Sequence, residues 1–279
     1  MVTRENNSTS CFDAFVNDFD GPMARSPVAR YHLSMLPALL GTVAGLSAAT
    51  IAGLHSMVPS WQLYGRSFVG LPLGTKKLAL TYDDGPNDPH TEHLLDVLAR
   101  HEVKATFFLI GRYVRQRPDI VRRIAEAGHA IGNHTWNHPN LIFCTPAETR
   151  RQLADAQEAI EDACGIKPTI FRPPFGGRRP GTFTTARSLG FEPIMWNVTC
   201  YDWNATSHES IEANARRQIR GGEVILLHDG GHKAFGIDRS HTVTATDTLL
   251  REYREKGFEF VSVPEMMGSS SRASVSSSQ

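Results

Sequence analysis

The sequence lacks several features that would place it in a common class. Basic and acidic residues balance at 29 each, so net charge does not favour nucleic-acid binding. No G-x-G-x-x-G follows the first expected strand, and no G-x-x-x-x-G-K-[ST] occurs, which argues against nucleotide binding. The 279 residues suffice for one large domain with a full core.

Cysteine is also scarce. The four cysteines form no Cys-x-x-Cys pair, which excludes zinc-finger and thioredoxin-like motifs, and they are too few for a disulfide scaffold. They are Cys11, Cys144, Cys164 and Cys200. In an oxidising compartment one bond among the last three is possible, and their odd number leaves a free thiol.

Charged residues are absent from a long stretch between Arg30 and Arg66. Inside it, Leu33–Leu54 is an uncharged run that would span about 33 Å as a helix, near the thickness of a bilayer's hydrocarbon core. Trp61 and Tyr64 follow, where an interfacial aromatic belt would lie. We expect a signal-anchor transmembrane helix. A buried core helix and a cleaved signal peptide are the alternatives.

This pattern divides the chain into five parts. Residues 1–30 are polar and without an evident fold, and residues 31–56 form the expected membrane helix. Residues 57–75 are a linker, 76–266 the folded domain, and 267–279 a disordered Ser-rich tail. Because long domains translocate regardless of modest charge bias, we expect the folded domain in the periplasm or at the cell surface, or secreted if the helix is cleaved.

From Lys77 onward, short apolar runs alternate with segments of helical periodicity. The expected strands are Leu78–Thr81, Ala105–Ile110, Ala130–Asn133, Thr169–Phe171, Phe191–Val198, Val224–Leu227 and Phe258–Val263. The expected helices are Thr91–His101, Pro118–Ala127, Ala147–Ala163, Gly181–Leu189, Ser207–Ile219 and Thr242–Glu255. This alternation predicts an α/β protein with a parallel sheet, as a (β/α)7-type distorted barrel that is closed or nearly closed. Chemistry in such barrels lies at the carboxyl ends of the strands.

Two motifs with metal-binding chemistry follow expected strands. Asp83 and Asp84 end the first, where one carboxylate can bind a metal while the other stays free as a base, although Asp-Gly-Pro alone more often marks a turn. His134 and His138 follow the third. Two histidines four apart lie on one face of a helical turn and can hold one cation, but such a pair is as often structural. Residue 135 is Thr, which excludes the His-Glu-x-x-His metalloprotease motif.

Further polar and aromatic residues follow the later strands, and each is a weak signal alone. Arg172 gains a role only as the partner of a carboxylate, whose orientation its planar guanidinium can fix. Trp203 is a wall or a sugar-stacking surface, and His228 is as often a core residue as a functional one. Because all of these groups would gather on one rim, the combination is more specific than its parts.

In this order the motifs resemble the polysaccharide deacetylase family, the NodB-homology domain of carbohydrate esterase family 4, over roughly residues 77–263. Thr81–Pro86 match the family's TFDDGP motif with Tyr in place of Phe. His134–His138 match H-[ST]-x-x-H, Arg172–Phe175 match R-x-P-[YF], and Leu226–His228 match L-x-H.

The fourth family motif, D-x-x-D-W, is incomplete in this chain. Asp202 and Trp203 are present, but Thr199 stands where the first Asp is expected. The resemblance assigns that first Asp to tuning the catalytic histidine. Another carboxylate, Asp202 or Asp229, would therefore have to take over this task for His228.

The resemblance implies a metal-dependent N-deacetylase acting on N-acetylglucosamine-type residues of cell-envelope polysaccharide, either peptidoglycan or a chitin-like polymer. Asp84, His134 and His138 would hold a divalent metal, with Zn²⁺ as the first expectation and Co²⁺ or another divalent ion as alternatives. Asp83, held by Arg172, would be the general base.

His228 would be the general acid, and the backbone N–H near Phe175 would stabilise the oxyanion. Phe175, Trp203 and Asp202 are the expected substrate-binding residues. The expected partners are an N-acetylated polysaccharide or oligosaccharide and, through the N-terminal helix, a membrane; no nucleic acid or obligate protein partner is expected.

Two other functions stay open. One is a NodB-type amide hydrolase of a non-sugar substrate, which a membrane anchor disfavours. The other is a non-catalytic glycan-binding member. That function predicts the loss of Asp83, Asp84 or His228, and all three are present, so Thr199 is the single point in its favour.

Overall fold

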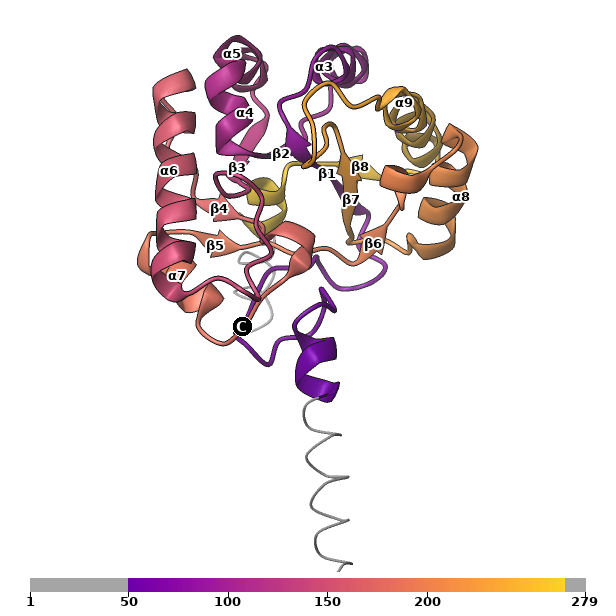
Figure 1. Ribbon diagram of the computed structural model, residues 1–279. Helices are drawn as coiled ribbons and strands as arrows, with labels where there is room; N and C mark the ends of the chain where they lie inside the picture. The colour runs from indigo at the N-terminus through magenta and orange to yellow at the C-terminus, as the bar shows by residue number, and fades with distance from the viewer. Residues whose placement is uncertain (1–49, 269–279) are drawn as a thin grey trace, which may run out of the picture. The chain divides into compact units, whose positions relative to one another are not determined.

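The computed structural model describes residues 50–268 (Figure 1). The chain divides into two compact units, Met1–Leu54 and His55–Gln279, and the second carries the fold described below. The predicted polar segment 1–30, the predicted membrane span up to residue 49 and the Ser-rich tail from residue 269 lie outside the described residues. Within the part of the chain that is described, we find no helix long and apolar enough to cross a membrane.

One eight-stranded sheet organises the domain, and each of its strand pairs is parallel (Figure 1). Along the sheet the strands are β5 (Glu192–Pro193), β4 (Ile170–Phe171), β3 (Ala130–Asn133), β2 (Thr106–Leu109), β1 (Lys77–Gly85), β7 (Val224–His228) and β6 (Val198–Thr199). β8 (Glu259–Phe260) pairs with β1 off this path. The predicted α/β class with a parallel sheet is therefore confirmed.

The sheet curls into a half-barrel, so the prediction of a closed or nearly closed barrel is wrong. β5 and β6 stand at opposite ends of the strand order, and the single strand expected over Phe191–Val198 is divided between them. The N-terminal part of the domain forms backbone bridges along the open side of the half-barrel. Phe68 forms a bridge with Ile194, and Gly70 forms one with Glu223 just before β7. The segment predicted as a linker thus contributes hydrogen bonds to the sheet.

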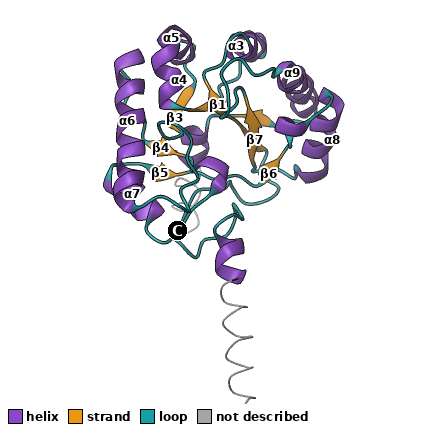
Figure 2. Cartoon of the chain, viewed as in Figure 1, coloured by secondary structure: helices purple, strands orange, loops and turns teal. Residues whose placement is uncertain are grey.

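Helices cover the convex side of the sheet (Figure 2). They are α3 (His90–Arg100), α4 (Gly111–Gln116), α5 (Pro118–Glu126), α6 (Pro146–Cys164), α7 (Thr182–Ser188), α8 (His208–Gln218) and α9 (Ser240–Glu255). Their ends follow capping chemistry: the Thr145 side chain accepts the Glu148 N–H at the start of α6, and Gly165 ends that helix with φ 73°. α4 was not predicted, because six residues directly after a strand are too few for a periodic pattern.

The two faces of β1 separate the core from the chemistry. Successive strand residues point to opposite faces, so Leu78, Leu80 and Tyr82 pack in the apolar cluster beneath the helices. Thr81 and Asp83 point to the concave face instead. Pairing between β1 and β7 sets Asp83 opposite His228, which brings a carboxylate and an imidazole to the same level of the sheet.

The cysteines form no disulfide in the described part of the chain. Cys144 and Cys164 are half-buried, Cys200 is buried, and all three are free thiols. The single bond that the sequence allowed is therefore absent among them. Burial raises the pKa of each thiol, which keeps the three side chains in the neutral form.

Candidate active site

The carboxyl ends of β1, β3, β4 and β7 bring the predicted polar residues together. Asp83 and Asp84 end β1, and both are buried. Adjacent strand residues would normally point to opposite faces. Here the register with β2 shifts between Asp83 and Gly85, and Asp84 adopts φ 72°. This bulge turns both carboxylates toward the same end of the sheet.

His134 and His138 converge on Asp84, as the spacing predicted, but not from a helical turn. The segment after β3 is irregular, and Thr135 and His138 have φ of 69° and 62°. His134 Nε2 lies 3.5 Å and His138 Nε2 3.1 Å from Asp84 Oδ1. His134 Nδ1 lies 2.8 Å from the Arg172 carbonyl, so this nitrogen carries the proton. Nε2 is then unprotonated, and its lone pair is available to a metal ion.

The electrostatics of this cluster suit a cation. Burial alone would raise the pKa of Asp84, but the facing imidazoles of His138 and His232 outweigh it and hold the pKa well below its usual value. Burial lowers the pKa of His134 to about 4. An ionised carboxylate and a neutral imidazole are the forms that bind metals. Asp84 Oδ1 is buried without a hydrogen-bond partner, so the donor set fits a divalent metal ion.

One histidine of this cluster escaped prediction. In the described part of the chain, Asp84, His138 and His232 form the one group whose three ligand atoms all lie within 4.8 Å of one another. His232 thus occupies the place in the tight group that was expected for His134. Spacing could have identified His232 from the sequence, because it follows His228 by four residues, just as His138 follows His134.

Arg172 holds Asp83 in place. Its Nη1 donates to Asp83 Oδ1 at 2.7 Å and to Thr81 Oγ1 at 2.8 Å, and its guanidinium lies over the Phe108 ring. Both charged side chains are buried. The second oxygen of Asp83 lies 3.8 Å from His134 Nε2, on the side of the Asp84 cluster.

His228 rests on Asp202, which corrects the expectation for Asp202. Asp202 was expected to bind substrate, but its side chain is fully buried beneath His228. Its Oδ1 lies 2.8 Å from His228 Nδ1, and its Oδ2 accepts the His228 backbone N–H at 2.7 Å. Burial alone would lower the pKa of His228. The charge of Asp202, supported by Asp84 and Asp83, outweighs it and raises the pKa to about 9.

Thr199 is therefore no obstacle to a carboxylate–imidazole pair. Its hydroxyl accepts the Trp196 Nε1–H at 2.9 Å. Of the two substitutes named from the sequence, Asp202 holds His228, whereas Asp229 accepts a hydrogen bond from Thr91 and takes no part in this pair.

Two exposed aromatic rings border the cluster. Phe175 is 44% exposed and packs edge-on against His138, with ring centroids 4.5 Å apart. Trp203 is 41% exposed and packs edge-on against His228 at 5.3 Å. Each of these predicted substrate-binding residues thus presents an apolar surface to solvent next to His138 or His228.

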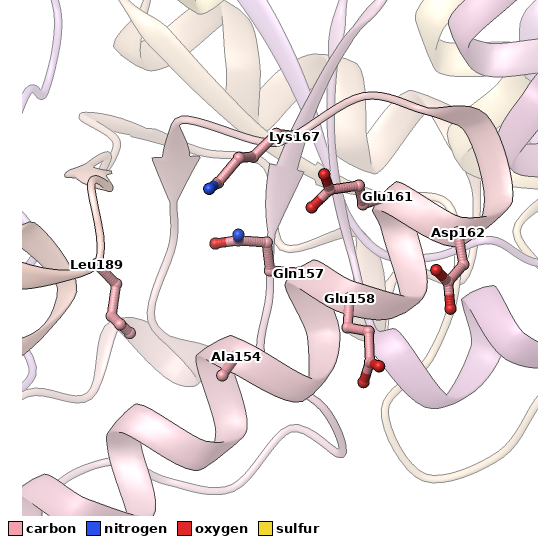
Figure 3. A pocket seen from close by; sticks show the side chains of 7 residues that line it. All are labelled: Ala154, Gln157, Glu158, Glu161, Asp162, Lys167 and Leu189. Carbon is pink, nitrogen blue, oxygen red and sulfur yellow. The ribbon is translucent and has the colours of Figure 1, made fainter.

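A separate hollow lies on the outer side of α6 (Figure 3). Its lining residues are Ala154, Gln157, Glu158, Glu161, Asp162, Lys167 and Leu189. None belongs to the cluster of three ligand atoms around Asp84. The chemistry expected from the sequence is concentrated at the strand ends instead.

Comparisons with known proteins find relatives over the domain that carries this site. The family model described as polysaccharide deacetylase matches residues 71–194. A peptidoglycan-N-acetylglucosamine deacetylase of Bacillus cereus is 37% identical over 214 residues, which cover 76% of this chain and 75% of the relative. A chitooligosaccharide deacetylase of a Bradyrhizobium species is 37% identical over 200 residues, covering 69% and 91%.

Solved structures share the fold. The crystal structure of a peptidoglycan N-acetylglucosamine deacetylase in complex with 4-naphthalen-1-yl-N-oxidanyl-benzamide has a TM-score of 0.67 and 36% identity, covering 72% of this chain and 92% of the other. A protein of Bacillus anthracis described as a CE4 family pseudoenzyme also has a TM-score of 0.67, with 28% identity and coverage of 72% and 68%. Since the second is a pseudoenzyme, the function of this chain has to be argued from its site residues.

Proposed function

This chain belongs to the polysaccharide deacetylase family, and we propose that it is a metal-dependent N-deacetylase acting on N-acetylglucosamine-type residues of cell-envelope glycan, either peptidoglycan or a chitin-like polymer. The observation that carries the proposal is the placement of Asp83 and His228. They are register partners on β1 and β7, one held by Arg172 and the other by Asp202, beside the Asp84 cluster. Hydrolysis of an acetamide needs a base for water and an acid for the departing amine.

Asp84, His134 and His138 would hold the divalent ion in this proposal. When bound, such an ion polarises the acetyl oxygen and lowers the pKa of a bound water. His134 is prepared for this role because its Nδ1 is engaged by the Arg172 carbonyl. The same residue, Arg172, thus orients both a metal ligand and Asp83.

Asp83 would accept the proton of the attacking water. Its Oδ1 is occupied by Arg172, so Oδ2 is the oxygen available as base. The bond from Arg172 fixes the orientation of the carboxylate whose second oxygen would take the proton. The backbone N–H of Phe175, in the short 3-10 helix Pro174–Gly176 where φ of that residue is 59°, would donate to the developing oxyanion.

His228 would deliver a proton to the leaving amine. Its Nδ1 faces Asp202, so Nε2 carries the transferable proton. A pKa of about 9 keeps the imidazole protonated at neutral pH, as a general acid requires. The Trp203 ring against one side of His228 restricts the orientation of the imidazole.

The substrate class follows from the aromatic border and the relatives. Phe175 and Trp203 offer apolar faces on which a pyranose ring can pack. The relatives are named for peptidoglycan N-acetylglucosamine and for chitooligosaccharides, which share the N-acetylglucosamine unit. Action on envelope glycan also implies an extracytoplasmic location for the enzyme, which we include in the proposal.

Acetate release tests this function. The full chain is incubated with N-acetylglucosamine oligomers and with peptidoglycan, before and after treatment with a chelator and then with Zn²⁺. We expect acetate that disappears with the chelator and returns with the metal. A metal-loaded protein that releases no acetate from any glycan would overturn the proposal. Activity on a non-sugar amide would then favour the hydrolase alternative, and inactivity on all amides the non-catalytic one.

A further inference from the structure

We propose that His232 supplies a fourth protein donor, through Nδ1, to the metal ion held by Asp84, His134 and His138. The inference rests on the proposed metal-dependent function. It concerns a residue outside the motifs that identified the family, in the segment between β7 and α9. Three independent observations support it: the distances to Asp84, the packing of the ring, and the anchoring of the segment.

The distances match those between two ligands of one ion. His232 Nδ1 lies 3.7 Å from Asp84 Oδ2, and His138 Nε2 lies 3.1 Å from Asp84 Oδ1. Zinc binds nitrogen and oxygen donors at about 2.0–2.2 Å, which puts two tetrahedral ligands roughly 3.4 Å apart. Asp84 therefore faces a histidine with each of its two oxygens.

The imidazole of His232 is fixed by aromatic packing. It stacks on His138 with ring centroids 4.6 Å apart and planes 19° apart, and Phe175 contacts it edge-on at 5.0 Å. This packing leaves few orientations for the ring. With its side chain 33% exposed, against 2% for His134 and 4% for His138, His232 would be the donor on the solvent side of the ion.

The backbone around His232 is held from several elements. Arg112 donates to the His232 carbonyl, and the Tyr113 hydroxyl donates to the Gly231 carbonyl at 3.0 Å. Arg239 Nε donates to the Gly230 carbonyl at 2.7 Å. A Cβ on Gly231 would meet Ile237 at 2.8 Å, so the turn before His232 is also tightly packed.

A fourth protein donor changes what the ion can do. It would take one position that water otherwise fills and slow the loss of the metal, and the water of the proposed reaction would then need a fifth position, which zinc can provide. We therefore expect this chain to retain Zn²⁺ more tightly than the variant that lacks the His232 imidazole. The first test is the dissociation constant for Zn²⁺ of the full chain, measured by competition with a chromophoric chelator.

The variants are His232→Ala, His134→Ala and, as a matched control, Lys233→Ala, which alters the exposed neighbour in the same segment. We expect His232→Ala to weaken Zn²⁺ binding by at least about tenfold, and Lys233→Ala to leave it unchanged. The visible spectrum of the Co²⁺-loaded protein provides a second readout. Exchange of an imidazole for water should alter this spectrum in His232→Ala, whereas Lys233→Ala should keep the parent spectrum.

The outcomes separate this inference from the proposed function. If the parent chain binds one Zn²⁺ that His134→Ala loses, while His232→Ala keeps the parent affinity and Co²⁺ spectrum, the inference is overturned and the proposed metal site stands. If the parent chain binds no Zn²⁺ or Co²⁺, both are overturned. Melting temperatures of the metal-free variants exclude a general effect on folding, because the His232 side chain is one-third exposed and its loss should leave these temperatures equal.

Discussion

The carboxylate of Asp202 contacts His228 twice, once at the ring Nδ1 and once at the backbone N–H. A third bond, from the Thr242 hydroxyl to Asp202 Oδ2 at 2.9 Å, fixes the carboxylate from below. The Asp202 side chain is fully buried and that of His228 is 14% exposed, so the negative charge acts on the imidazole with little screening by water. This relationship makes Asp202 a positioning residue for the proposed acid.

Removal of that charge should shift the pH profile. In the parent chain His228 has a pKa of about 9, so the protonated acid is lost only as the pH rises through 9. Asp202→Asn removes the charge that raises this pKa. We expect the alkaline limb of kcat/KM to move to lower pH, measured as acetate release between pH 6 and 10. An alkaline limb at the parent position in Asp202→Asn would contradict the pairing.

A matched pair of variants should distinguish the proposed base, Asp83, from a proposed metal ligand, His134. Asp83→Asn keeps the shape of the side chain but cannot accept the proton of water, so we expect turnover to fall by about 10²–10⁴-fold. Zn²⁺ content should be unchanged. His134→Ala should lose Zn²⁺ as well as turnover. The measurements are metal content per chain and acetate release; full activity in Asp83→Asn would remove Asp83 as the base.

The stability of the fold should respond to a methyl group at Gly85. A Cβ there would meet the Asp229 carboxylate at 2.3 Å, so the β1 end or Asp229 would have to shift. We expect Gly85→Ala to lower the free energy of unfolding by about 1–3 kcal/mol, measured by urea titration. Gly268→Ala is the matched control, because nothing lies within 4 Å of its Cβ position. Equal stabilities of the two variants would refute the close contact.

Asp229 should give the stability a distinct pH dependence. Burial raises its pKa to about 7, helped by the charges of Asp84 and Asp83 and opposed by the Thr91 hydrogen bond. A raised pKa means that the folded state binds the proton more tightly than the unfolded one. The associated stability is complete below pH 4 and is lost as the pH rises through about 7.

The variant Asp229→Asn removes this titration. We expect the unfolding free energy of Asp229→Asn to rise relative to that of the parent between pH 4 and 7, by up to about 4 kcal/mol. Urea unfolding at five pH values in this range and above measures the difference. A difference that is constant with pH would show that Asp229 does not titrate on unfolding.

The sequence predicted the parts of this fold that depend on local patterns. The alternation of apolar runs and helical segments identified the parallel sheet, and glycine and proline positions located most helix ends, as at Gly165 after α6. The order of the motifs identified the family. These features are encoded within a few neighbouring residues, so one sequence suffices for them.

Other features depend on contacts between distant segments and escaped prediction. The shift of register at Asp84 arises from pairing with β2, and nothing in the local sequence requires it. The sequence named Asp202 both as a substrate-binding residue and, with Asp229, as a substitute partner for His228, and the choice between these roles required the fold, which brings Asp202 beneath the ring. His232 joined no motif, because its segment approaches Asp84 only in the folded chain.

The segment that runs along the open side of the half-barrel bears on how the protein can be shortened. Phe68 exchanges backbone bonds with Pro193 and Met195, and the buried Arg178 donates to the carbonyls of Val58 and Trp61. A chain that began at residue 76, the boundary drawn from the sequence, would remove the Val58 and Trp61 carbonyls and leave the buried Arg178 guanidinium with the Gly176 carbonyl. It would also bare a sheet edge, and bare edges recruit strands from other molecules. By covering this edge, the segment before residue 76 therefore lowers the tendency of the domain to aggregate.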